Sequence, residues 1–507
     1  MATPLRRLRH LAGVTLALLP SAAALRSRAA QEVSKLNSEA SPVRQQLANY
    51  SDLHHNGSNL ADWGKVANYS DVQQYHGSNL TDVQQHSGSN LTIGGKVANN
   101  SDSQQGNGSN ENGKRRGDDL DTNVSKASPL RQQLANYRDL QYYGNLTIGG
   151  QNITGLLDTG SFELVVFSKQ CKTCGIAGVY DEKNSSAFTR GVLTQVHAYG
   201  SGKCRAIDGF DTVEVGAFGT VAARGLSSGS QAMWLAEDCK MPLLKSASFN
   251  AIAGIGPPGQ PEYSAKRELD KLKKKAKGYR DSFLLVPDDL EDQISEKELE
   301  LKIAKGKPSM LENFDVTTFS HCLGKDMGSP GWLFWNDDTR KGEPGVLKIP
   351  VSGSITWSIK AMDMAFDEGA DADIVACRDG CGALVDTGTS MFAVPTEIYD
   401  DIFGSVNNYI RAHRSDKVRP DCTDLSTFPD LVMYIGSDKL SFPPSSYLGL
   451  YYGQMSKEVS QFVRMDALEG TRCKLLLMDL GKTQETFMGP QIILGMPFFR
   501  EYYTTFD

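Results

Sequence analysis

Two segments of this 507-residue chain carry the same tripeptide, Asp-Thr-Gly, in closely similar surroundings. The first reads LLDTGS around Asp158, and the second reads LVDTGT around Asp386. A single copy is weak evidence, because an Asx-type turn between two strands gives the same pattern. Two copies, each after an apolar run and before a hydroxyl residue, favour a chain built from two similar halves.

Paired aspartates in such loops are suited to peptide hydrolysis without a metal or a covalent nucleophile. One carboxylate can take a proton from water while the second carboxyl group protonates the scissile carbonyl. Two carboxyl groups a few ångströms apart do not both ionise readily, so the pair shares one proton. We expect Asp158 to be the more readily ionised member, because the Ser161 hydroxyl can donate a hydrogen bond to it.

Six residues beside the aspartates have predicted supporting roles: Gly160, Gly388, Ser161, Thr389, Thr159 and Thr387. The glycines permit tight turns and a close approach of the two loops. The hydroxyl residues after them can donate hydrogen bonds to the outer carboxylate oxygens. The two threonines inside the tripeptides can tie the loops together through buried side-chain hydrogen bonds.

From Leu134 onward the chain consists of short runs of Val, Ile, Leu, Thr and Tyr separated by glycine. This texture predicts an all-β fold, with a hairpin at the GGQN sequence after Ile148. One segment, Tyr263 to Lys307, is instead dense in Lys and Glu and predicts helices. We interpret it as a helical surface insertion, and a docking site for a partner is the alternative.

The N-terminal residues 1–24 have a basic start, an apolar run from Leu11 to Leu19 and a stretch of small residues. This pattern predicts a signal peptide, because a membrane anchor needs about 20 apolar residues. No later stretch of the sequence is apolar for long enough to cross a bilayer. Eleven Asn-x-Ser/Thr sequons also fit a chain that enters the secretory pathway. They are Asn49, Asn56, Asn68, Asn79, Asn90, Asn99, Asn107, Asn123, Asn145, Asn152 and Asn184.

Residues 25–126 are rich in Asn, Ser, Gly, Gln and Asp and poor in apolar residues. Such a composition predicts a disordered, glycosylated pro-region. It contains repeats, among them SNLTIGGKV from residue 89, which is echoed by GNLTIGGQN from residue 144. Their irregular spacing argues against a solenoid. The basic run Lys114 to Arg116 is a predicted processing site, with the mature chain beginning before Leu134.

Further motifs follow the two Asp loops in a fixed order. The sequence AYGSGKCRAIDGFDTVEVG begins about 40 residues after Asp158, and a glycine after two apolar residues recurs at Gly254 and Gly495. Over roughly residues 134–507, the chain resembles the pepsin-like family of aspartic proteases. The resemblance implies a bilobal all-β fold with pseudo-two-fold symmetry. The lobes would be residues 127–335, with a helical insertion at 259–310, and residues 336–507, and they would meet between about residues 318 and 350.

The resemblance also implies an activity, an acid-acting aspartic endopeptidase made as a secreted zymogen. Tyr199, with Gly200 and Ser201 at the turn, matches the flap that closes over substrate. Protein or peptide substrates would bind as an extended strand, and no cofactor or metal is expected. We expect a monomer in the secretory pathway, either extracellular or in an acidic vacuole or lysosome-like compartment. A formal net charge of -7 argues against nucleic acid as a partner.

The nine cysteines fit this resemblance. It implies the disulfides Cys171–Cys174, Cys377–Cys381 and Cys422–Cys473, with Cys204–Cys239 as an addition. Cys322 would remain a buried free thiol. A zinc site at the closely spaced cysteines is the alternative, which the oxidising secretory route disfavours.

The chain departs from the family pattern at two places. Val165 stands where relatives carry a tryptophan that hydrogen-bonds the flap tyrosine. The sequence YYTTFD stops at Asp507, where relatives continue into closing strands, and a missing strand would leave an unpaired sheet edge.

Two other kinds of function are compatible with parts of the sequence. A catalytically silent binding protein of the same fold is the main alternative, since fold does not imply function. The intact Asp158, Asp386, Ser161, Thr389 and Tyr199 weigh against it. The glycosylated repeats could instead be an adhesive or surface-coat module that carries a protease domain.

Overall fold

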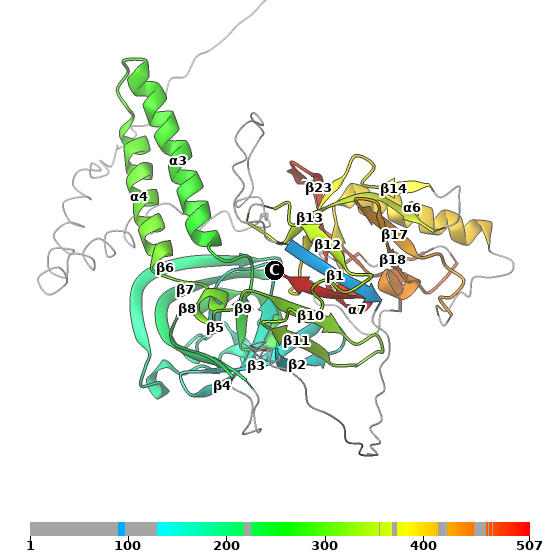
Figure 1. The fold of residues 1–507 in the computed structure, drawn as a ribbon, viewed down its shortest axis with the longest axis horizontal. Coiled ribbons are helices and arrows are strands. Elements are labelled where there is room, and N and C mark those ends of the chain that lie inside the picture. Colours follow the sequence, from blue (N-terminus) through cyan, green and yellow to red (C-terminus); the bar gives the residue numbers. More distant parts are fainter. Residues whose placement is uncertain are drawn as a thin grey trace, which may run out of the picture. The chain divides into compact units, whose positions relative to one another are not determined.

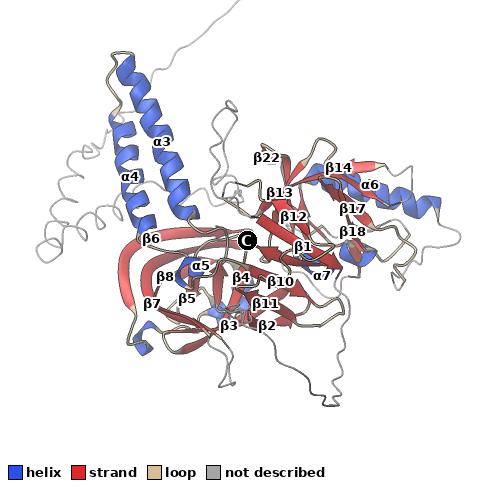
Figure 2. Cartoon of the chain, viewed as in Figure 1, coloured by secondary structure: helices blue, strands red, loops and turns tan. Residues whose placement is uncertain are grey.

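The computed structural model describes residues 90–96, 129–216, 225–353, 355–367, 373–413, 422, 424–450, 463–464, 466–468 and 470–507. The predicted signal peptide, the processing site and most of the predicted pro-region lie outside these residues. Strands hold more of the described residues than helices do (Figures 1 and 2).

Thirteen of the described strands form one large sheet. In spatial order they are β12 (Leu347–Pro350), β1 (Asn90–Lys96), β24 (Tyr502–Phe506), β10 (Phe319–Leu323), β11 (Gly331–Trp335), β2 (Leu130–Tyr137), β3 (Gln141–Ile148), β4 (Gln151–Asp158), β9 (Ala251–Gly254), β5 (Leu164–Phe167), β8 (Leu226–Lys240), β7 (Gly202–Val215) and β6 (Thr189–Tyr199).

Nine further described strands form a second sheet. Its main path runs β18 (Asp438–Phe442), β17 (Leu431–Ile435), β13 (Ser358–Phe366), β15 (Cys381–Val385), β23 (Gly489–Leu494), β16 (Phe392–Val394) and β21 (Leu477–Asp479), with β14 (Ile374–Ala376) beside β13 and β22 (Glu485–Thr486) beside β23. A separate pair joins β19 (Leu448–Gly449) to β20 (Lys474–Leu475).

The two large sheets contain the same four-strand unit. In the first, β4 is parallel to β9, β9 is antiparallel to β5, and β5 is parallel to β8. In the second, β15 is parallel to β23, β23 is antiparallel to β16, and β16 is parallel to β21. This repetition confirms the predicted all-β fold with two related lobes.

The hairpin between β3 and β4 illustrates how local sequence determines a turn. Ile148 pairs with Gln151, so only Gly149 and Gly150 connect the strands. Both glycines have positive φ angles, 55° and 73°. Glycine adopts this left-handed region without the steric cost that a Cβ would bring, and two such residues give the turn that matches the twist of the strands.

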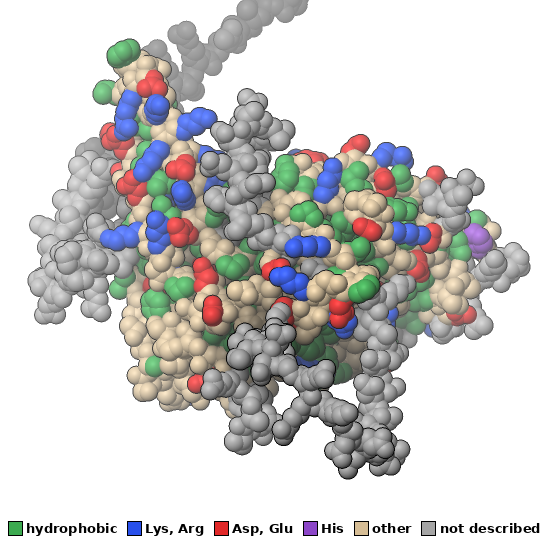
Figure 3. Space-filling view, in the orientation of Figure 1, with side chains coloured by type: hydrophobic (Ala, Val, Ile, Leu, Met, Phe, Trp, Pro, Cys, Tyr) green, Lys and Arg blue, Asp and Glu red, His purple; other side chains and the backbone are tan. Residues whose placement is uncertain are grey.

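The predicted insertion is helical, as expected. Helices α3 (Gln260–Asp281) and α4 (Asp288–Lys305) form an antiparallel hairpin beside the first sheet (Figure 1). An ion pair with an N to O distance of 2.7 Å joins Lys273 to Glu298. Apolar side chains gather at its tip (Figure 3), where Phe283, Leu284 and Leu285 are exposed.

The other helical segments in the described part of the chain are short, except for one. They are α5 (Met310–Asn313), α6 (Thr396–Ala412), α7 (Met496–Glu501), and the 3-10 turns η3 (Gly175–Ala177), η4 (Glu182–Asn184), η5 (Pro242–Lys245) and η6 (Pro444–Ser446). Among the helices that the structure describes, none combines the length and the apolar character that crossing a membrane requires.

Strand β1 lies within the segment that the composition predicts to be disordered, and the structure describes residues 90–96 of that segment as a strand. The strand pairs antiparallel with β12 on one side and with β24 on the other. Leu91 is fully buried and belongs to the main hydrophobic core. The physical reason is local, because the Leu-Thr-Ile run has high β-propensity and copies the sequence of β3 within an otherwise polar region.

The first sheet crosses the predicted boundary between the lobes at residues 335 and 336. It takes in β12 and β24, which follow that boundary in sequence, beside β10 and β11, which precede it. The predicted meeting region of residues 318–350 therefore lies within this shared sheet. Strand β24 pairs with β10 and β1, so the expected unpaired edge is not found at this strand.

Candidate active site

The two Asp-Thr-Gly loops occupy equivalent places in the two four-strand units. Asp158 is the last residue of β4 and pairs with Gly254 of β9. Asp386 directly follows β15, whose last residue, Val385, pairs with Leu494 of β23. In each unit a tight turn begins where a buried strand ends, and the aspartate is placed at the start of that turn.

Each aspartate receives the same two hydrogen bonds from its own loop. The amide of Gly160 donates to Asp158 Oδ1 at 2.9 Å, and the Ser161 hydroxyl donates to Oδ2 at 2.6 Å. The amide of Gly388 donates to Asp386 Oδ1 at 2.7 Å, and the Thr389 hydroxyl donates to Oδ2 at 2.5 Å. The expected hydroxyl donors are therefore in place, and they fix the plane of each carboxyl group.

The threonines of the two tripeptides cross-link the loops. The Thr387 hydroxyl accepts a hydrogen bond from the Thr159 amide at 3.0 Å and donates one to the Leu157 carbonyl at 2.6 Å. The Thr159 hydroxyl accepts from the Thr387 amide at 3.0 Å and donates to the Val385 carbonyl at 2.9 Å. Both threonine side chains are buried, so these reciprocal bonds hold the two loops in register.

The glycines bring the two carboxyl groups together. A Cβ placed on Gly388 would lie 2.4 Å from Asp158 Oδ1 and 3.1 Å from Asp386 Oδ1. A Cβ on Gly160 would lie 2.7 Å from Asp386 Oδ1. These contacts are too short for any side chain, and they place both carboxyl groups within reach of one small bound molecule.

Burial and the neighbouring carboxyl group shift the titration of the pair. Asp158 is 7% exposed and Asp386 is 3% exposed. Burial, followed by the negative charge of Asp386, raises the pKa of Asp158 well above its usual value, against the hydrogen bond from Ser161. Desolvation therefore outweighs the hydroxyl donor at Asp158, and the order in which the two aspartates ionise stays a prediction. The pair therefore holds a proton at a pH where a free carboxyl group has lost it.

This geometry is accompanied by a match to a known family. The family model of the eukaryotic aspartyl proteases matches residues 141–285 and 311–507. The chain belongs to this family. Similar proteins include Pepsin A from Bos taurus, which is 28% identical over 74% of this chain and 84% of its own length. Pepsin A from Gallus gallus is 27% identical over 76% of this chain and 86% of its own length. The protein is thus an aspartic-type endopeptidase.

The segment that the resemblance predicts to be the flap forms a hairpin of β6 and β7. Tyr199 is the last residue of β6 and pairs with Gly202, so Gly200 and Ser201 form the turn. The family match leaves out residues 286–310, which include α4. The helical hairpin is therefore in part an addition to the family fold.

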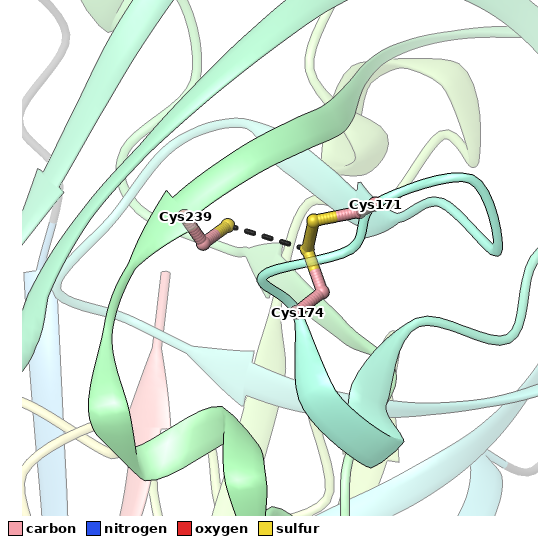
Figure 4. A group of neighbouring side chains, drawn as sticks. All are labelled: Cys171, Cys174 and Cys239. Atoms are coloured by element: carbon pink, nitrogen blue, oxygen red, sulfur yellow. Dashed lines mark hydrogen bonds between the residues drawn. A yellow bond between two sulfur atoms is a disulfide. The ribbon is translucent and has the colours of Figure 1, made fainter.

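All four expected disulfides are present: Cys171–Cys174, Cys204–Cys239, Cys377–Cys381 and Cys422–Cys473. Cys322 is a free thiol, half-buried rather than fully buried. The sulfur atoms of Cys171, Cys174 and Cys239 lie within 4.8 Å of one another (Figure 4). Each of these sulfurs is already in a disulfide, so none is a thiolate that could bind zinc.

Sequence reasoning did not identify a group of charged and aromatic side chains at the base of the flap. Glu163, His197 and Trp234 contact one another there, although they lie far apart in the sequence. The substitution at Val165 was a partial signal, because Val165 pairs with Trp234 on the neighbouring strand. A tryptophan is therefore present beside the position where the resemblance places one.

The raised pKa of Asp158 predicts how stability depends on pH. The folded state binds the shared proton more tightly than the unfolded chain does. The stability that this proton provides is complete below the ordinary carboxyl pKa and is lost as the pH rises through the raised value. Asp158→Asn has no such proton to lose, so its stability should not show this loss. The Tm of the variant minus the Tm of the unmodified protein should therefore increase from about pH 4 to about pH 7. A Tm difference that is constant over this range would contradict the raised pKa.

Proposed function

We propose that Asp158 and Asp386 activate one water molecule for attack on the peptide bond. The observation that carries this proposal is the matched pair of buried, hydrogen-bonded carboxyl groups, of which Asp158 has a raised pKa. The ionised carboxylate takes a proton from the water while the protonated one donates to the scissile carbonyl. The substrate lies as an extended strand between the dyad and the flap, where Tyr199 excludes water.

The pH dependence follows from the shared proton. Hydrolysis requires one ionised and one protonated carboxyl group, so activity falls when the pair loses its last proton or gains a second one. The enzyme is therefore expected to act in acid. Digestion of a denatured protein at about pH 3 to 5, with and without a statine-type inhibitor, tests this. Hydrolysis that is unaffected by the inhibitor and persists at neutral pH would rule the mechanism out.

We also propose that the enzyme is a secreted, glycosylated zymogen. The signal-peptide pattern and the sequons support secretion, and Asn145, Asn152 and Asn184 are exposed and accessible to glycosylation. The basic run Lys114 to Arg116 supports cleavage of the pro-region. Such a cut separates β1 from β2 in the chain but leaves β1 paired on both sides in the sheet. Removal of the pro-region thus requires that β1 leaves its place.

Sequencing of the mature N-terminus under native and denaturing conditions tests this part. We expect a start between residue 117 and Leu134, and we expect the cleaved peptide that carries β1 to remain bound until the protein is denatured. Fully active enzyme that still carries residues 31–113 in one covalent chain would contradict activation by removal.

A further inference from the structure

Five side chains form a partly buried cluster at the base of the flap, here called the flap-base cluster: Glu163, His197, Asp208, Trp234 and Lys307. They come from the segment before β5, from β6, β7 and β8, and from the segment after α4. Partly buried charged groups are energetically tolerated when each is paired with an opposite charge or hydrogen-bonded.

Glu163 is fixed relative to the first catalytic aspartate. Its carbonyl accepts a hydrogen bond from the Gly254 amide at 3.1 Å, and the Asp158 carbonyl accepts one from the Ile255 amide at 2.8 Å. Both ends of the segment from Asp158 to Glu163 are thus bound to the end of β9. The Glu163 carboxylate therefore has a defined position with respect to the dyad.

The two carboxylate oxygens of Glu163 face two different elements. Oε1 accepts a hydrogen bond from the indole nitrogen of Trp234 at 3.1 Å. Oε2 lies 3.3 Å from His197 Nδ1. Partial burial acts to raise the pKa of Glu163, but the hydrogen bond and charge of His197, with the Trp234 donor, lower it overall. The carboxylate therefore keeps its charge, and its contact with the histidine, to a lower pH than a free glutamate does.

His197 connects this carboxylate to the flap. It lies two residues before Tyr199 on β6, so the two side chains project from the same face of the strand. Its side chain is 7% exposed, and its ring packs against Trp234 with centroids 4.9 Å apart. Within the described part of the chain, Nε2 has no hydrogen-bond partner, so Glu163 supplies the polar contact of this buried ring.

Lys307 and Asp208 hold the same region from the other side. Lys307 Nζ lies 2.8 Å from Asp208 Oδ2 and 4.3 Å from the centre of the Trp234 ring. Asp208 Oδ1 accepts a hydrogen bond from the Leu193 amide of β6 at 2.7 Å. The end of the helical insertion is thus joined to both flap strands. The Glu163–His197 contact joins β6 to the segment that follows Asp158.

We propose that Glu163 and His197 are positioning residues that set the place of the flap tyrosine over the catalytic dyad. The proposal rests on the proposed function, because it assigns Tyr199 to substrate binding. Glu163 is fixed to the Asp158 loop, and His197 is fixed to the strand that ends at Tyr199. The contact between them fixes the position of the flap strand relative to the catalytic loop. In relatives, a tryptophan at the position of Val165 contacts the flap tyrosine, and this contact serves that role here.

His197→Ala tests the proposal through a separation of KM from kcat. Loss of a hydrogen bond to a charged group should raise KM for a peptide substrate by about 10- to 100-fold, while kcat changes less because the dyad is intact. Glu163→Gln retains an acceptor without the charge and should have an intermediate KM. Val196→Ala is the control, since Val196 is the neighbouring β6 residue, is 56% exposed and lies on the other face of the strand.

The outcomes separate this proposal from a purely structural role and from the proposed function. A lowered Tm with an unchanged KM in both His197→Ala and Glu163→Gln would show that the cluster only stabilises the fold, and would overturn the proposal. If His197→Ala fails to fold, the KM of Glu163→Gln decides alone. Asp158→Asn is measured beside them. If Asp158→Asn still hydrolyses the substrate, the proposed function fails. If Asp158→Asn is inactive but the two cluster variants have an unchanged KM, only the positioning role is refuted.

Discussion

Asp158→Asn and Asp386→Asn are each expected to lower kcat by at least about 100-fold, and by up to about 10,000-fold, because each removes a general acid-base group. Asparagine has nearly the shape of aspartate. Its one side-chain oxygen can still accept the hydrogen bond from the loop amide, and its NH2 group can donate to the hydroxyl oxygen of Ser161 or Thr389. It cannot take up or release the shared proton. The two residues act as one unit, so the double variant should lose little more activity than either single variant.

The measurement is kcat and KM at about pH 4, within the range where carboxyl groups titrate. Asp438→Asn is the control, because Asp438 is exposed on β18 and lies outside the dyad. A melting curve for each variant shows whether the fold is retained. Undiminished hydrolysis by either dyad variant would exclude the aspartic mechanism for this protein.

Leu91→Ala is expected to destabilise the fold by about 2–5 kcal/mol, the usual range for a leucine removed from a packed core. Leu91 is fully buried on β1 and pairs with Phe506 and Ile349 of the two neighbouring strands. The substitution removes apolar contacts from the sheet that the two lobes share. The free energy of unfolding, from denaturant titration of the uncleaved chain, gives the measurement.

Leu285→Ala is the matched control for this effect. Leu285 is 94% exposed at the tip of the helical hairpin, so its truncation should change stability by less than about 0.5 kcal/mol. Equal stabilities for Leu91→Ala and the unmodified chain would show that β1 is not part of the folded enzyme in solution. The predicted disorder of residues 25–126 would then hold for this segment too.

The fold and the centre of the site could be predicted because their signals are local. Each Asp-Thr-Gly turn follows an apolar strand within a few residues, and the hydrogen bonds to the carboxyl groups come from the next three positions. The helical hairpin was also visible, since Lys- and Glu-rich segments favour helices irrespective of tertiary contacts. The cysteine pairs followed from the resemblance to the family.

Features that depend on distant contacts could not be predicted. The Leu-Thr-Ile run of β1 favours a strand, but its pairing with β12 and β24 joins residues that lie far apart in the sequence. The flap-base cluster joins Glu163, His197 and Lys307, which the sequence separates widely and the sheet brings together. The burial that raises the pKa of Asp158 also could not be read from its neighbours in the sequence.

The position of β24 has a consequence for how the chain folds during synthesis. Strand β24 lies between β10 and β1, yet the ribosome makes β1 early and β24 only after both lobes. Until residues 502–506 emerge, β1 and β10 each lack a neighbour, and the apolar Leu91 and Phe319 lack Phe506, their shared partner. Contacts of such long sequence separation form slowly, and unpaired edges invite association with other chains. Chaperones would therefore have to protect each of these two strand edges from its own synthesis until residues 502–506 emerge.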